Sequence, residues 1–64
     1  MNAPPMGPRK LAYTMASAAV ATDLSEKTVQ RAIRSGALRA KKVGRGVRIL
    51  HPDLVEWLKE LPDA

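Results

Sequence analysis

The spacing of apolar positions predicts two short helices in the middle of the chain. In residues 15–22, apolar and small side chains recur at the i, i+3, i+4, i+7 spacing of a helix that buries one face. Val29, Ala32 and Ile33 show the same spacing in a second segment. Only Asp23–Ser25 separates the two segments. Two helices joined by so tight a turn are typical of a helix-turn-helix, whose second helix lies in the major groove of DNA.

Residues at the expected helix ends support this division. Thr14 and Ser25 are good N-caps, because a hydroxyl oxygen accepts a hydrogen bond from an N–H group of the first turn. Glu26 complements the positive end of the second helix. Asp23 occupies the position of the turn that most often needs a left-handed backbone. Gly36 fits the position after the second helix, where a left-handed residue without a Cβ ends a helix.

After these helices the pattern changes to that of a short β-hairpin. Leu38 is expected to return to the core, and the apolar positions 40, 43, 47 and 49 surround a turn at Gly44-Arg45-Gly46. A basic hairpin that directly follows a recognition helix is a wing. Its tip and outer face are expected to carry Lys41, Lys42, Arg45 and Arg48.

A third helix is expected after the hairpin. Pro52 suits the first helical position, Asp53 complements the positive helix end, and Pro62 ends the helix. His51 is expected to be a capping or surface residue. In this helix Trp57 is expected to anchor the core rather than to stack on bases. The predicted apolar stripe contains Leu54, Trp57, Leu58 and Leu61.

These elements predict one small domain over residues 11–61, of class α+β and with winged helix-turn-helix architecture. Residues 1–10 contain three prolines and a glycine, which predicts a flexible N-terminal arm. Arg9 and Lys10 in this arm are expected to be solvated, with phosphate contact as the alternative. Residues 62–64 are expected to form a tail. A chain of 64 residues buries only a thin core.

Charge divides the domain into a basic part and an acidic part. Lys and Arg number 11 against six Asp and Glu, so the net charge is +5. Residues 25–48 contain eight basic residues and one acid, whereas residues 51–64 contain four acids and one base. A cationic segment beside an acidic one indicates a face that binds a polyanion. A basic surface that serves only solubility is the alternative.

The polar face of the second helix carries side chains suited to reading DNA. Arg and Lys bind guanine edges, Gln binds adenine, and Thr binds phosphate or a thymine methyl group. Solvated surface is the alternative for each side chain taken alone. Because recognition helices contact bases mainly through their N-terminal half, the side chains expected nearest the groove floor are Lys27, Thr28, Gln30 and Arg31. The full set of candidate contacts on this helix is Ser25, Lys27, Thr28, Gln30, Arg31 and Arg34.

The wing offers a second candidate contact. Arg45 lies between two glycines at the hairpin tip, where it is placed to enter an adjacent minor groove and sense its width and potential. The alternative is a hairpin that only closes the core. The candidate contacts of the wing are Lys41, Lys42, Arg45 and Arg48.

The composition argues against several other functions. With no cysteine and one histidine, neither a metal site nor a cofactor is expected. The sequence has no nucleophile with a paired base and no convergent carboxylates, so an enzyme is not expected. Gly44–Gly46 lacks the pattern of a phosphate-binding loop. No apolar run is long enough for a membrane span. The absence of cysteine is compatible with an intracellular location.

Several stretches together resemble the small winged-helix domain of the excisionase group, the phage recombination directionality factors related to the DNA-binding domain of the MerR regulators. The resemblance covers residues 13–58. In two places the chain departs from the family pattern: Asp23 stands where glycine is usual, and Val47 where an aromatic or bulky residue is common. The specific marks are Ala18-Ala19, Leu24-Ser25, Thr28-Val29, Arg34-Ser35-Gly36-x-Leu38, Gly44-Arg45, Arg48-Ile49 and Leu54-x-x-Trp57-Leu58.

The resemblance implies that the second helix lies in the major groove and that the wing contacts the adjacent minor groove. It also implies cooperative binding to repeated sites, DNA bending, partnership with a tyrosine-type integrase, and a cytoplasmic location on the DNA of a bacterial host. The positions that match the contacts of the family are Ser25, Lys27, Thr28, Arg31, Arg34, Arg45 and Arg48.

We therefore expect a sequence-specific architectural protein that binds double-stranded DNA, an excisionase that binds near attachment sites, bends DNA and directs an integrase towards excision. The chain shows neither an effector domain nor a long dimerisation helix, which favours this role over a regulator. The alternatives are a small phage or plasmid repressor or activator of the MerR-like type, and a protein-interaction module that uses the acidic last helix. Charge segregation also leads us to expect that this helix contacts the basic surface of a neighbouring subunit along DNA.

Overall fold

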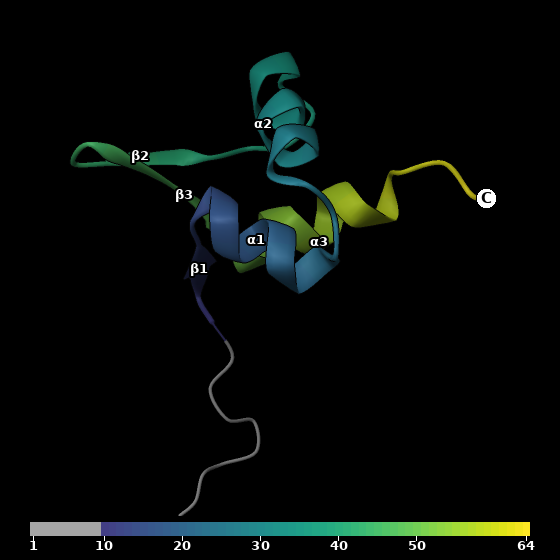
Figure 1. Ribbon diagram of the computed structural model, residues 1–64, viewed down its shortest axis with the longest axis horizontal. Coiled ribbons are helices and arrows are strands. Elements are labelled where there is room, and N and C mark those ends of the chain that lie inside the picture. The colour runs from purple at the N-terminus through teal and green to yellow at the C-terminus, as the bar shows by residue number, and fades with distance from the viewer. Residues whose placement is uncertain (1–9) are drawn as a thin grey trace, which may run out of the picture.

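Three helices and three short strands make up the part of the chain that the computed structural model describes, residues 10–64 (Figure 1). The arm predicted for residues 1–10 lies outside this part except for Lys10. In chain order the elements are β1 (Ala12–Tyr13), α1 (Met15–Thr22), α2 (Glu26–Ser35), β2 (Lys41–Val43), β3 (Gly46–Leu50) and α3 (His51–Lys59). No helix in the described part is long and apolar enough to cross a membrane.

The strands form an antiparallel sheet in the order β1-β3-β2. β1 pairs with the C-terminal end of β3, where Tyr13 lies opposite Ile49, and β2 pairs with the N-terminal part of β3. The sequence did not predict β1. The α+β class and the winged helix-turn-helix architecture are confirmed.

The core is small and lies where the three helices meet β3. Ala18 and Ala19 of α1 face Val29 and Ala32 of α2, and these short side chains allow the two helix backbones to approach closely. Trp57 is 5% exposed, which confirms it as a core residue. The complete buried set is Ala18, Ala19, Val29, Ala32, Leu38, Ile49, Leu54 and Trp57.

The last helix is shorter than predicted, and its apolar stripe is only half buried. Lys59 is its final residue, and the N–H of Glu60 donates to the carbonyl oxygens of Glu56 and Trp57. Pro62 lies two residues after the C-cap residue Glu60, where a proline prevents the helix from continuing, as predicted. Leu58 and Leu61 are 37% and 40% exposed, so the prediction that they belong to the buried stripe is wrong.

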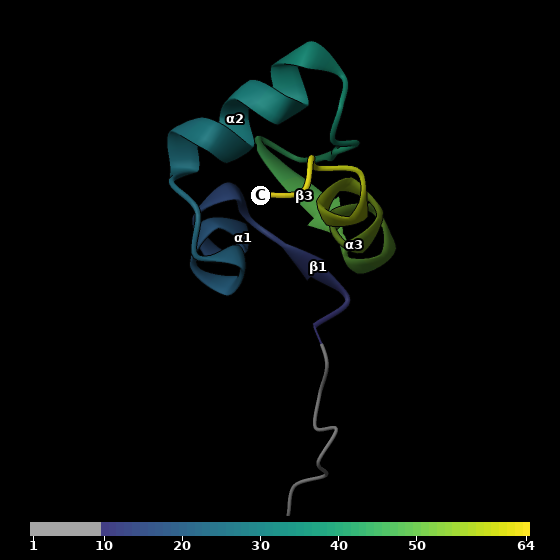
Figure 2. The ribbon, with the colours of Figure 1, turned by 90° about the vertical axis from the view of Figure 1, so that its right-hand side faces the viewer.

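The arrangement of the helices leaves α2 and the hairpin free on their outer sides. In Figure 2, α1 and α3 lie on either side of β3, and α2 crosses above them. In Figure 1 the β2–β3 hairpin projects away from the helices to the left. From buried Ile49 to Gly46, β3 runs three residues outward, which at the rise of a strand is about 10 Å.

Candidate nucleic-acid interface

The turn between α1 and α2 has a fixed backbone geometry. Asp23 adopts the left-handed conformation, with φ 61° and ψ 32°. The N–H of Asp23 donates to the carbonyl of Val20 at 3.2 Å, and the N–H of Leu24 donates to the carbonyl of Ala19 at 3.0 Å. These two bonds are those of a Schellman motif. The left-handed residue predicted for this turn is confirmed.

The N-terminus of α2 is capped by a pair of hydroxyl groups. Ser25 Oγ accepts a hydrogen bond from the Thr28 N–H at 3.1 Å, which confirms the predicted N-cap. The two side-chain oxygens of Ser25 and Thr28 are 2.9 Å apart and share a second hydrogen bond. Thr28 is half-buried at this helix end rather than fully on the exposed face. Both hydroxyls therefore lie at the positive end of the helix dipole, a position that favours an anion.

The exposed side of α2 carries a cationic row. Lys27, Arg31 and Arg34 follow the i, i+4, i+7 spacing, and at 100° per residue this row lies opposite buried Val29. All three side chains are exposed. Gln30 is also exposed and flanks the row. The helix thus presents its basic side chains along one line.

The wing turn is tighter than predicted. Val43 pairs with Gly46, so only Gly44 and Arg45 form the turn, and Gly46 already belongs to β3. Gly44 has φ 60°, whereas Arg45 is not among the positive-φ residues of the described chain. This is the φ pattern of a type II′ hairpin turn, which requires glycine at its first central position. Arg45 is exposed at the tip.

The basic side chains of the wing do not share one outer face, contrary to the prediction. Lys41 lies opposite Arg48, and Lys42 lies opposite Val47. Because successive residues of a strand point to opposite faces, Lys41 and Arg48 are on one face and Lys42 is on the other. The wing therefore presents cations on both faces as well as at its tip, an arrangement suited to a hairpin between two phosphate backbones.

Arg48 is folded back along the hairpin. Its Nη1 donates to the carbonyl oxygen of Val47 at 3.0 Å. The guanidinium lies over Gly46, where a Cβ would approach Nη1 to 3.0 Å. Gly46 thus leaves room for this side chain, and Arg48 is half-buried. Its guanidinium has further N–H groups, so it can hold the wing and still donate to a phosphate.

The base of the sheet is tied to α3 by two side chains. Tyr13 Oη and His51 Nδ1 are 3.0 Å apart and share a hydrogen bond, and the two rings stack at 5.9 Å. His51 is half-buried and is the first residue of α3, whose N-cap Leu50 makes no side-chain cap. The prediction of a capping or surface role for His51 is therefore wrong. Lys10 Nζ lies 5.9 Å from the Tyr13 ring centroid, within reach of a cation–π contact.

Comparison with known families agrees with this geometry. A family model described as a helix-turn-helix domain matches residues 12–62, well over half of the chain. Neither a curated protein nor a solved structure matches at a significant level. Domains of this kind bind DNA and are typically non-enzymatic. On this evidence the chain belongs to the helix-turn-helix domain family and is a DNA-binding protein.

Proposed function

We propose that the chain is a sequence-specific architectural protein for double-stranded DNA, an excisionase that binds near attachment sites, bends the DNA and directs a tyrosine-type integrase towards excision. In this proposal α2 lies in a major groove and the wing enters the neighbouring minor groove. Copies bound at repeated sites associate along the DNA.

One observation carries the proposal: a cationic row and a basic hairpin extend from the same small core. α2 has ten residues, a length of about 15 Å, and a helix fits the major groove of B-DNA. The wing extends beyond Ile49 far enough for Arg45 to enter a minor groove. Both surfaces are rich in cations, which supports binding to phosphates on either side of each groove.

The residues have different roles in this proposal. Lys27, in the first turn of α2, and Arg31, one turn further along, reach base edges. Gln30 lies beside them. The hydroxyls of Ser25 and Thr28 bind a phosphate at the helix end. Arg34, in the last turn of α2, adds a contact in the major groove. Arg45, at the wing tip, makes the contact in the minor groove. The side chains assigned to backbone phosphates on the wing are Lys41, Lys42 and Arg48.

The excisionase role is supported by the family resemblance and by the two-groove arrangement. A protein that fills a major and a minor groove with one rigid body favours DNA whose groove geometry matches it, and so selects bent or deformable sequences. The alternative, a small phage or plasmid regulator, uses the same DNA-binding surface. The two roles differ in which DNA is bound and in whether binding changes recombination or transcription.

Binding and its surface are tested by fluorescence anisotropy on labelled duplexes with competitor DNA. Arg31→Ala and Arg45→Ala should each weaken specific binding by about 1–3 kcal/mol, or roughly 5- to 150-fold in Kd, if the arginine makes a good bidentate contact. Lys59→Ala, which removes an exposed cation from α3, is the matched control and should leave Kd unchanged. If Arg31→Ala and Arg45→Ala bind DNA as tightly as the wild type and the Lys59→Ala control, the assigned surface is wrong. If Kd scarcely depends on salt, the basic surface does not contact phosphates.

The biological role is tested with attachment-site and promoter duplexes in parallel. An excisionase should prefer attachment-site DNA, shift its mobility in a circular-permutation bending assay, and stimulate excision by the cognate integrase over integration. Preference for promoter DNA, together with altered transcription in vitro and no effect on recombination, would assign the chain to the regulator class instead.

A further inference from the structure

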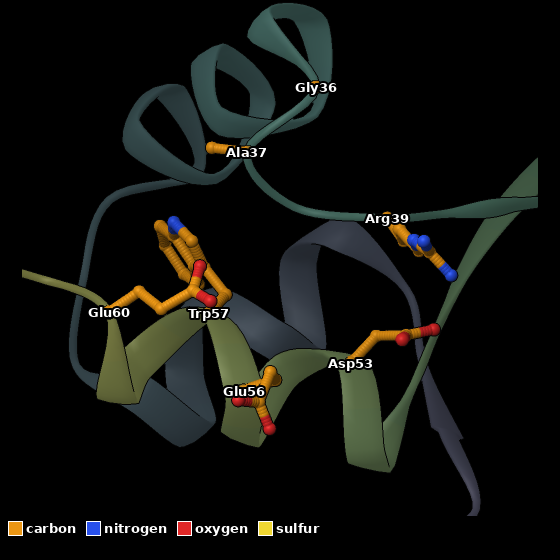
Figure 3. Close-up of a pocket in the computed structure, with 7 residues that line it drawn as sticks. All are labelled: Gly36, Ala37, Arg39, Asp53, Glu56, Trp57 and Glu60. Carbon is orange, nitrogen blue, oxygen red and sulfur yellow. The ribbon is translucent and has the colours of Figure 1, made fainter.

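A pocket of about 420 Å³ lies between the α2–β2 connection and α3 (Figure 3). One wall is the connection from α2 to β2, with Gly36, Ala37 and Arg39. The other wall is α3. The residues that line it from α3 are Asp53, Glu56, Trp57 and Glu60.

The pocket is acidic although the chain is basic. Three carboxylates and one guanidinium line it. In Figure 3 the Arg39 and Asp53 side chains extend towards one another at one end. The Glu60 carboxylate lies beside Trp57 at the other end, and Glu56 lies one helical turn before Glu60 on α3; no lining residue at this end is basic. This end therefore has a net negative potential that attracts a cation.

Trp57 supplies a second and independent feature. The side chain is 95% buried, and its ring nitrogen is directed across the pocket towards Ala37 (Figure 3). Within residues 10–64, none of the side-chain or backbone hydrogen bonds involves its indole N–H. Indole N–H groups donate only, and buried ones usually have an acceptor. The indole N–H therefore has no acceptor within residues 10–64, and a ligand in the pocket can supply one.

We propose that this pocket binds a basic segment of another protein. An Arg or Lys side chain of the segment lies between Glu56 and Glu60 beside the Trp57 ring, and a peptide carbonyl of the segment accepts the indole N–H. The cation gains from both carboxylates. The volume lies in the lower part of the range of ligand pockets, enough for one such side chain with its adjoining peptide group.

Two features of the chain favour another protein as the occupant. A second copy of this chain carries its exposed cations mainly on α2 and the wing, the surfaces proposed to bind DNA, so they are engaged when both copies are on DNA. A polyamine carries cations but no acceptor for the indole N–H. The carboxylates of the pocket are repelled by phosphates, which favours a protein segment over DNA as the occupant.

The test uses Trp57 as its own reporter, because it is the only tryptophan of the chain. The probe is a blocked heptapeptide of alternating glycine and arginine, titrated into the full chain without DNA. We expect a saturable change in tryptophan emission. A matched peptide with glutamine in place of arginine should bind at least about fivefold more weakly, since the charge-assisted contacts are lost.

Variants separate this site from general charge attraction. Glu56→Gln and Glu60→Gln should each weaken peptide binding at least about threefold, whereas Asp63→Asn removes an equal charge from the exposed tail and should not. Circular dichroism verifies that each variant is folded. The proposal is overturned by an unchanged emission, by equal binding of the glutamine peptide, by equal weakening in Asp63→Asn, or by spermidine that binds as tightly as the peptide. Because no DNA is present, these outcomes are independent of the DNA-binding experiments.

Discussion

Asp23 is the residue whose replacement tests most directly how the turn sets the position of α2. Its left-handed backbone is held by the two Schellman hydrogen bonds to Val20 and Ala19. For a residue with a Cβ this conformation costs roughly 1–2 kcal/mol, and less for Asp and Asn, whose short side chains form local hydrogen bonds. Asp23→Ala should therefore destabilise the fold by about 1 kcal/mol.

Asp23→Gly is the informative counterpart. Glycine has no steric cost at this φ, but it raises the entropy of the unfolded chain by an amount worth about 0.4–1 kcal/mol. The two effects oppose each other, so stability should change by less than about 0.5 kcal/mol in either direction. For a domain of this size, 1 kcal/mol corresponds to roughly 4–8 °C in Tm. Asp23→Ala should then melt about 4–8 °C lower than the wild type, and Asp23→Gly within about 3 °C of it.

Thermal unfolding followed by circular dichroism measures both variants. Asp63→Ala makes the same chemical change at an exposed position near the C-terminus and should leave Tm unchanged. An alanine variant as stable as the wild type would show that residue 23 does not need a left-handed backbone, and the account of the turn would be wrong. A glycine variant that is strongly destabilised would show that the Asp23 side chain contributes through a contact rather than through its tolerance of this conformation.

Three further substitutions test the core, the helix cap and the wing. Leu38→Ala, at a side chain that is 1% exposed, should cost about 2–5 kcal/mol in urea unfolding, whereas Leu11→Ala at 85% exposure should cost little. Ser25→Ala removes the N-cap of α2 and should cost about 1 kcal/mol by the same measurement; no loss would exclude the cap as a stabilising contact. Gly46→Ala places a Cβ 3.0 Å from Arg48 Nη1 and should displace the guanidinium. Its effect on DNA affinity should disappear in an Arg48→Ala background, and persistence there would mean that the glycine acts through the backbone.

The helix ends were predictable from the sequence because their signals are local. Asp23, Ser25 and Gly36 each act within a few residues of their own position, and the structure places all three in the expected conformations. The buried positions of α1 and α2 likewise follow from a helical period that the sequence displays. Leu61 was misassigned because α3 ends at Lys59, two residues before it; Pro62 signals that the helix stops but does not fix the exact last residue.

Features that depend on pairing between distant segments were not predictable. β1 has only two residues, too few for a period, and exists because Ala12 and Tyr13 pair with β3. The register that places Lys41 opposite Arg48 also depends on pairing, whereas the opposite faces of Lys41 and Lys42 follow from strand alternation alone. The Tyr13–His51 hydrogen bond and the pocket beside Trp57 likewise join residues far apart in the sequence.

The junction between β3 and α3 has a mechanical consequence. β3 ends at Leu50 and α3 begins at His51, with no connecting residue between them. The wing strand β3 and helix α3 are therefore continuous in the backbone. Near the point where they join, Ile49 is buried and Tyr13 is hydrogen-bonded to His51. If a DNA minor groove tilts the tip of the hairpin, then either the backbone angles at the β3–α3 junction change or α3 turns together with the hairpin. In the proposed complex, a change in minor-groove width would therefore act either on the backbone angles at this junction or on the orientation of α3.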